Sequence, residues 1–89
     1  MRVKLSPEFY KRLKEANVRI RKSFKEQIAI FQKNLKDPRL DNHTLRDEYA
    51  GYSSIDITAD WRAIFEIIGD GEDAVAWFVD LGKHKDLFK

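Results

Sequence analysis

The sequence has 89 residues, and 43% of them are hydrophobic, which is enough for one packed domain over residues 1–89 with little surplus stability. The absence of cysteine excludes disulfides and thiolate chemistry. The sequence has no apolar run of about 20 residues, as a membrane span requires. It also shows no signal peptide, so we expect a cytoplasmic protein without a membrane partner.

The formal net charge is only +2, but the charges are unevenly distributed along the chain. Residues 1–40 contain 12 Lys and Arg against 4 Asp and Glu, a balance of +8. Residues 41–89 contain 5 against 11, a balance of −6. A basic segment of this kind either contacts a nucleic-acid backbone or is the hydrated outer surface of a helix pair.

The N-terminal residues predict a short strand followed by a helix. Residues 2–5 alternate apolar and polar side chains, as a strand does. Ser6 is a suitable N-cap and Pro7 suits the first helical position, so a helix is expected to start here. Asn17 marks the expected break before the next helix.

A second helix is predicted from an apolar stripe at steps of three and four residues. We expect it to end at Asp37, because the residue before Pro38 is disfavoured in helical conformation. The stripe either packs in the core or forms a dimer seam. Its members are Ile20, Phe24, Ile28, Phe31 and Leu35, and the opposite side carries Arg19, Arg21, Lys22, Lys25, Lys33 and Lys36.

The second half of the chain predicts a polar loop over residues 39–51 and then three strands, at residues 53–58, 61–68 and 74–81. The last strand is nearly all apolar, so we expect it to be central and buried on both faces, with Gly82 ending it. The element order β-α-α-β-β-β predicts an α+β fold, in which two N-terminal helices pack on one face of a small, mostly antiparallel sheet.

Alternation along the third strand of this series predicts which side chains share the open face of the sheet. Arg62 is expected there, with Asp56 on the polar face of the preceding strand and Asp60 at the strand entry. His84 follows the last strand. Together they form a candidate catalytic group. Three non-catalytic alternatives remain: Arg62 pairs with Glu66, Asp60 is a turn residue, and the histidines are surface residues without a role.

These residue types are suited to the cleavage of RNA. The ribose 2′-OH must lose a proton as it attacks the adjacent phosphate, and the leaving 5′-oxygen must gain one. Histidine can carry out both proton transfers at neutral pH. A guanidinium or ammonium group stabilises the charge that develops on the phosphate. Candidates for that contact are Arg62, Lys83 and Lys85, and candidates for base stacking are Tyr52, Trp61 and Phe88.

Four short motifs in their order along the chain resemble the RelE/ParE toxin superfamily, and most closely its YafQ-like branch of ribosome-dependent mRNA interferases. They are His43-Thr44-Leu45, Gly51-Tyr52, Asp60-Trp61, and Gly82-Lys83-His84-Lys85-Asp86-Leu87-Phe88. By this resemblance His43 is the loop histidine of the branch, Asp60 is the catalytic aspartate, His84 acts in proton transfer, and Phe88 is the terminal aromatic residue.

Two positions depart from the pattern of the YafQ-like branch. Asp56 stands where that branch has a further histidine, which removes an imidazole and adds a negative charge where a phosphate should approach. Arg62 stands where the branch usually has an apolar residue. It resembles the arginine of the RelE branch, which contacts the scissile phosphate. The chain therefore combines features of two branches.

The resemblance implies a toxin of a type II toxin–antitoxin system that cleaves translated mRNA without a cofactor or metal. Its implied partners are a cognate antitoxin, in a toxin–antitoxin hetero-oligomer, and the ribosome with its mRNA. The alternatives are a ParE-like inhibitor of DNA gyrase and a catalytically weakened toxin fold that only binds an antitoxin. The predicted catalytic residues are His84, His43, Asp60 and Arg62, and the predicted substrate-binding residues are Lys83, Lys85, Phe88 and Asp56.

Overall fold

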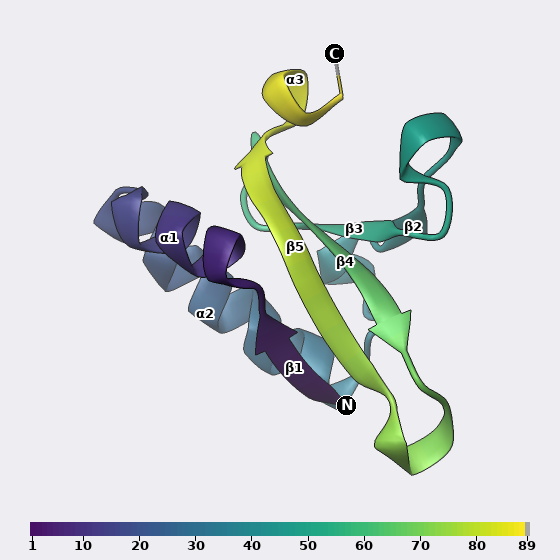
Figure 1. Ribbon diagram of the computed structural model, residues 1–89. Coiled ribbons are helices and arrows are strands. Elements are labelled where there is room, and N and C mark those ends of the chain that lie inside the picture. The colour runs from purple at the N-terminus through teal and green to yellow at the C-terminus, as the bar shows by residue number, and fades with distance from the viewer. Residues whose placement is uncertain (89) are drawn as a thin grey trace.

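The computed structural model describes residues 1–88 and consists of a five-stranded sheet with two longer helices on one face (Figure 1). Lys89, the last residue of the predicted domain, lies outside the described residues. The strands are β1 (Arg2–Leu5), β2 (His43–Thr44), β3 (Ser53–Asp56), β4 (Trp61–Ile68) and β5 (Val75–Lys83). The helices are α1 (Pro7–Glu15), α2 (Val18–Lys33) and the short α3 (His84–Leu87).

The order of strands in the sheet is β1-β5-β4-β3-β2. Strand β1 lies parallel to β5, while the other neighbours are antiparallel. The α1–α2 pair makes the connection from the edge strand and covers one face of the sheet, as Figure 1 shows. The predicted α+β class, with two N-terminal helices on one side of a mostly antiparallel sheet, is confirmed.

The core lies between the two helices and the sheet, and its centre is aromatic. Phe31 packs edge-on against both Phe65 of β4 and Phe78 of β5, with ring centroids 5.1 and 5.5 Å apart. The predicted stripe of α2 therefore faces the core. The helix ends earlier than predicted, at Lys33, and Asn34 caps it in extended conformation. The predicted N-cap Ser6 accepts a backbone N–H of α1, and Asn17, which was predicted only as the break between the helices, caps α2 in the same way.

Strand β5 differs from the prediction in two respects. Gly82 does not end the strand but lies within it, paired with Arg62 of β4, and the strand continues to Lys83. Nor is the strand buried on both faces: Phe78 is fully buried, whereas its neighbour Trp77 is only partly covered. The helices cover one face alone, so alternate residues of β5 face the open side.

The loop predicted over residues 39–51 contains structure that the sequence pattern did not reveal. It includes the two-residue strand β2 and short 3-10 turns at Pro38–Leu40 and Asp47–Tyr49. The C-terminal tail forms α3, an element that the predicted order β-α-α-β-β-β does not contain. In the part of the chain that is described, no helix is both long and apolar enough to cross a membrane.

Candidate active site

The open face of the sheet carries a polar cluster where β3, β4 and β5 lie side by side. The register places Asp56 opposite Arg62, and Arg62 in turn opposite Gly82. Residues directly opposite each other in antiparallel strands have side chains on the same face. Because Gly82 has no side chain, the Arg62 side chain has no neighbour from β5 at this position. The guanidinium is thus free to turn toward β3 and β2.

Arg62 is the centre of this cluster and is only 8% exposed. Its Nε donates to the Oγ of the fully buried Ser54 at 3.1 Å. Its Nη1 lies 2.9 Å from the carboxylate of Asp56 and 3.7 Å from that of Asp41, and its Nη2 donates to the Asp41 carbonyl at 3.2 Å. The cation is therefore held from two chain segments, β3 and the turn at Asp41, and these contacts offset the cost of burying its charge.

His43, on the edge strand β2, joins this cluster. Its Nδ1 lies 2.9 Å from the Asp41 carbonyl, and the Nη2 of Arg62 lies 3.2 Å from Nδ1 and 3.5 Å from Nε2. The histidine is otherwise exposed. Although β2 has only two residues, its pairing with β3 places the imidazole beside the arginine.

Asp56 lies in a mixed electrostatic environment. Burial raises the pKa of its carboxyl group, an effect larger than the lowering by the Arg62 guanidinium. The Asp41 carboxylate raises the pKa further, whereas His43 and His84 lower it. Both histidines, which come from opposite ends of the second half of the chain, thus act on the same carboxyl group.

His84 begins α3 at the end of β5, next to the turn that precedes β4. Its backbone N–H donates to the carbonyl of Asp60 at 2.8 Å. Its imidazole packs against the Phe88 ring, with centroids 4.9 Å apart. Asp60 and His84 line a hollow of about 460 Å³, together with Ala59, Lys83 and Lys85. The exposed histidine thus borders a space that has two lysines and a carboxylate on its rim.

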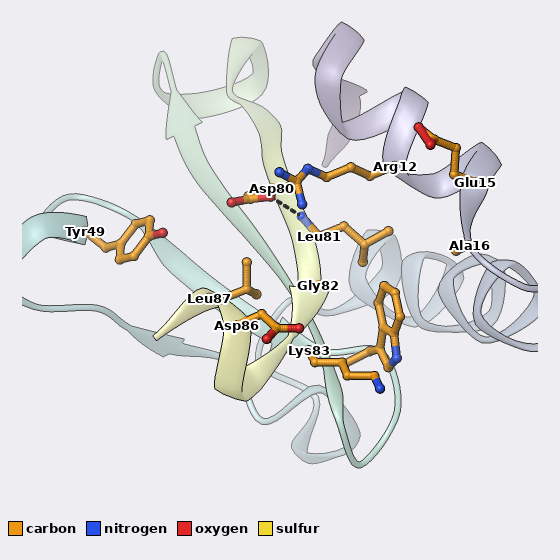
Figure 2. Close-up of a pocket in the computed structure, with 11 residues that line it drawn as sticks. Arg12, Glu15, Ala16, Tyr49, Asp80, Leu81, Gly82, Lys83, Asp86 and Leu87 are labelled. Carbon is orange, nitrogen blue, oxygen red and sulfur yellow. Dashed lines mark hydrogen bonds and ion pairs between the residues drawn. The ribbon is translucent and has the colours of Figure 1, made fainter. Parts of the chain in front are cut away.

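Helix α3 is held over the end of β5 by a close contact between Leu87 and Gly82, which lie side by side in Figure 2. A Cβ atom at Gly82 would lie 3.3 Å from the Leu87 Cδ2, so only glycine leaves this contact unstrained. A groove of about 350 Å³ lies beside this Gly82–Leu87 contact, between α1 and β5. There Arg12 pairs with Asp80 at 3.4 Å.

Comparisons with known proteins identify the family. The profile described as "ParE toxin of type II toxin-antitoxin system, parDE" matches residues 3–88. The chain belongs to this toxin family. Among solved structures, the YafQ toxin of E. coli strain BL21(DE3) superposes with a TM-score of 0.78 over 100% of both chains at 24% identity. No curated protein sequence matches the chain.

Two further solved structures share the fold of this toxin. The YoeB/ParE toxin of Agrobacterium tumefaciens has a TM-score of 0.78 at 17% identity, covering 94% of this chain and 99% of its own. RelE in the RelB–RelE antitoxin–toxin complex of Methanococcus jannaschii has a TM-score of 0.70 at 24% identity, covering 94% and 93%. The protein is thus a toxin of a type II toxin–antitoxin system. It has the fold of the RelE/ParE superfamily, which its YafQ-like members share.

The toxin's predicted site residues fall into two neighbouring groups. One contains His43, Asp56 and Arg62, joined by direct contacts. The other contains Asp60 and His84, together with the remaining predicted residues Lys83, Lys85 and Phe88. The alternative pairing of Arg62 with Glu66 is wrong, because Arg62 pairs with Asp56 and Asp41 on the open face. Within residues 1–88, no three His, Asp or Glu side chains are placed to hold a metal ion.

Three residues of the site were missed by sequence reasoning. Asp41 contributes its backbone carbonyl, Ser54 a buried hydroxyl, and Tyr49 a ring whose centroid lies 5.9 Å from that of Phe88. Alternation along the strand would have placed Ser54 on the face of Arg62, and this signal was available. A backbone carbonyl has no signature in residue type, so Asp41 could not have been found in this way.

The basic side of α2 lies on the helix layer and not at this site. Its lysines and arginines are exposed, as predicted from their positions. Arg21 donates to the Lys14 carbonyl, which fixes it to the preceding helix. Within residues 1–88 the other basic residues of this side, and Lys36 just beyond the helix end, make no ion pair. Those on the helix are Arg19, Lys22, Lys25 and Lys33. The toxin therefore presents a cationic surface distinct from the histidine cluster.

Proposed function

We propose that the toxin is a ribosome-dependent endoribonuclease that cleaves translated mRNA by general acid–base catalysis. The observation that supports this most is that two exposed histidines both act on the carboxyl group of Asp56, which is paired with the buried Arg62. Two imidazoles, which can serve as general acid and general base, next to fixed positive charge match the demands of 2′-OH attack on a phosphate. Family membership supports the toxin role but does not specify the reaction.

In this proposal His43 and His84 divide the proton transfers. One accepts the proton of the attacking 2′-OH, and the other donates a proton to the leaving 5′-oxygen. Asp60, next to His84 at the hollow, orients the imidazole or takes part in proton transfer. Phe88 packs against His84 and offers a ring for a base to stack on.

Positive charge for the phosphate comes from two sources that differ in accessibility. Lys83 and Lys85 are exposed at the hollow and can contact a phosphate directly. Arg62 already uses its donors on Ser54, Asp41 and Asp56. It therefore acts through its field and by holding His43, unless a phosphate displaces the Asp56 carboxylate from Nη1.

The partners that we propose are a cognate antitoxin, the ribosome and its mRNA. The E. coli YafQ fold has been solved in a DinJ–YafQ toxin–antitoxin complex, and this chain matches it over 98% of its length at 22% identity. An equivalent hetero-oligomer would neutralise this toxin in the cytoplasm. The basic side of α2 would contact ribosomal RNA, and such contacts should weaken as salt concentration rises.

A second candidate function is inhibition of DNA gyrase, which would need no RNA cleavage. The observation in its favour is that the matching family profile is that of ParE. A third is a catalytically weakened toxin, favoured by the Asp56 carboxylate that occupies Arg62. These candidates differ from the first in that neither requires His84.

The decisive experiment is primer extension on mRNA in a reconstituted translation reaction, with and without ribosomes. We expect cuts within translated codons that need the ribosome and disappear in His84→Ala. A matched control is Lys11→Ala, an exposed position on α1, which should cut like the parent protein. Absence of cuts by the folded parent protein would overturn the proposal, and a gyrase supercoiling assay on the same sample would then test the second candidate.

A further inference from the structure

The turn before β2 has an unusual backbone. Asp41 adopts a left-handed conformation, with φ 48° and ψ 47°, at the end of the 3-10 turn Pro38–Leu40. Its N–H donates to the Pro38 carbonyl at 3.2 Å, which closes that turn. Its own carbonyl then meets two nitrogen atoms of the site, the Nη2 of Arg62 at 3.2 Å and the Nδ1 of His43 at 2.9 Å.

The two contacts decide which ring nitrogen of His43 carries the proton. A carbonyl oxygen can only accept hydrogen bonds, so the 2.9 Å contact is favourable only when Nδ1 is protonated. With Nδ1 unprotonated, two lone pairs would face each other. The guanidinium Nη2 does not need Nδ1 as its acceptor, because the Asp41 carbonyl accepts from it. One tautomer therefore satisfies all three groups.

We propose that Asp41 is a positioning residue, whose backbone carbonyl holds neutral His43 in the Nδ1–H tautomer and leaves Nε2 as the basic nitrogen. A hydrogen bond at one ring nitrogen is the usual means by which a protein selects the reactive one. Nε2 lies 3.5 Å from the nearest guanidinium nitrogen, at the outer limit of a hydrogen bond, so its lone pair can accept a proton from a substrate hydroxyl.

The side chain of Asp41 contributes much less than its carbonyl. It is 63% exposed, and its carboxylate lies 3.7 Å from Arg62, a separation at which an exposed ion pair is weak. Residue 41 must instead be able to adopt the left-handed conformation. Glycine does so freely, whereas β-branched residues are disfavoured there.

The tautomer can be measured directly by long-range ¹H–¹⁵N NMR of the imidazoles in the full-length protein at a pH where they are neutral. The His84→Gln variant assigns the two rings. We expect a protonated, pyrrole-like Nδ1 and an unprotonated, pyridine-like Nε2 for His43. The reverse pattern would overturn the proposal. Only the catalytic consequence rests on the proposed ribonuclease function, so a protein without nuclease activity would still show this tautomer.

Two substitutions test the consequence for catalysis. Asp41→Gly should keep the Nδ1–H tautomer of His43 in the NMR measurement, because the carbonyl stays in place and glycine adopts the left-handed conformation freely. Asp41→Val should lose the Nδ1–H preference and lower kcat about tenfold while KM stays nearly unchanged. Loss of the Nδ1–H tautomer in Asp41→Gly as well, or a loss in Asp41→Val confined to KM, would overturn the positioning role. Thermal unfolding of each variant separates a loss of fold from a change of tautomer.

Discussion

The carboxylate of Asp56 lies 2.9 Å from the Nη1 of Arg62, and the two residues are directly opposite each other on β3 and β4. The guanidinium that would stabilise a phosphate is thus already paired inside the protein. The resemblance to the YafQ-like branch places a histidine at this position, and such a residue would leave Nη1 with only the more distant Asp41 carboxylate, at 3.7 Å, as an acidic partner. The pair therefore sets how strongly the site attracts an anion.

Removing the charge of Asp56 should strengthen binding of RNA. In Asp56→Asn the side chain keeps its size and one oxygen acceptor, but Arg62 is no longer neutralised. We expect the Kd for a short single-stranded RNA to fall about three- to tenfold, as for a partly buried charge worth about 1 kcal/mol. Fluorescence anisotropy at fixed salt measures this change.

The control for the Asp56 variant is Asp73→Asn, which removes the same charge from an exposed turn at the far end of the β4–β5 hairpin. Its RNA affinity should change by less than twofold, because exposed charges at that distance are screened by salt. An equal fall of the RNA Kd in both variants would show that the net charge of the protein determines RNA affinity and that the Asp56–Arg62 pair does not.

Arg62 should also be important for stability. Arg62→Ala leaves the hydroxyl of the fully buried Ser54 without its donor and the Asp56 carboxylate without its cation. We expect a loss of about 2–4 kcal/mol in the free energy of unfolding, measured by urea denaturation. Arg12→Ala is the matched control, since that arginine is about half-exposed and should cost less than about 1 kcal/mol.

The helices and the core could be predicted from the sequence because their signal is local and periodic. The stripe of α2 places Phe24 and Phe31 at helical spacing, and both are buried. The end of α2 could not be placed as well. Pro38 disfavours helical conformation at the preceding residue, Asp37, but the helix already ends at Lys33, where Asn34 follows in extended conformation. Asparagine occurs in caps, turns and loops, so a single sequence does not show that Asn34 ends the helix.

The site was predictable in its residue types but not in its contacts. His43, Arg62 and His84 were identified from their chemistry and the family motifs. Their connection depends on register and on Asp41, whose contribution is a backbone carbonyl at a positive φ. Gly82 was interpreted as a strand end because glycine is rare within strands. In the structure it allows α3 to pack closely on β5, which is another recognised use of glycine.

The contact between Gly82 and Leu87 can be tested with a double-mutant cycle. A Cβ at residue 82 meets the Leu87 side chain at 3.3–3.4 Å, so Gly82→Ala should destabilise the protein by roughly 1 kcal/mol. Leu87→Ala makes room for that Cβ. In its background the same glycine substitution should cost clearly less, because the two residues share one contact. Thermal unfolding of the four proteins measures the coupling, and strict additivity would contradict a direct contact.

Tyr52 precedes β3 and should titrate at higher pH than an ordinary tyrosine. The Glu66 carboxylate raises the pKa of Tyr52 above 10.0, first through a hydrogen bond and then through its charge. The stability that this hydrogen bond contributes should therefore be fully present below pH 10 and be lost as the pH rises through the elevated pKa. Absorbance of the tyrosinate, compared between the parent protein and Tyr52→Phe, isolates this residue. Glu66→Gln should return the Tyr52 pKa toward 10.0, and an unchanged pKa would mean that Glu66 is not its cause.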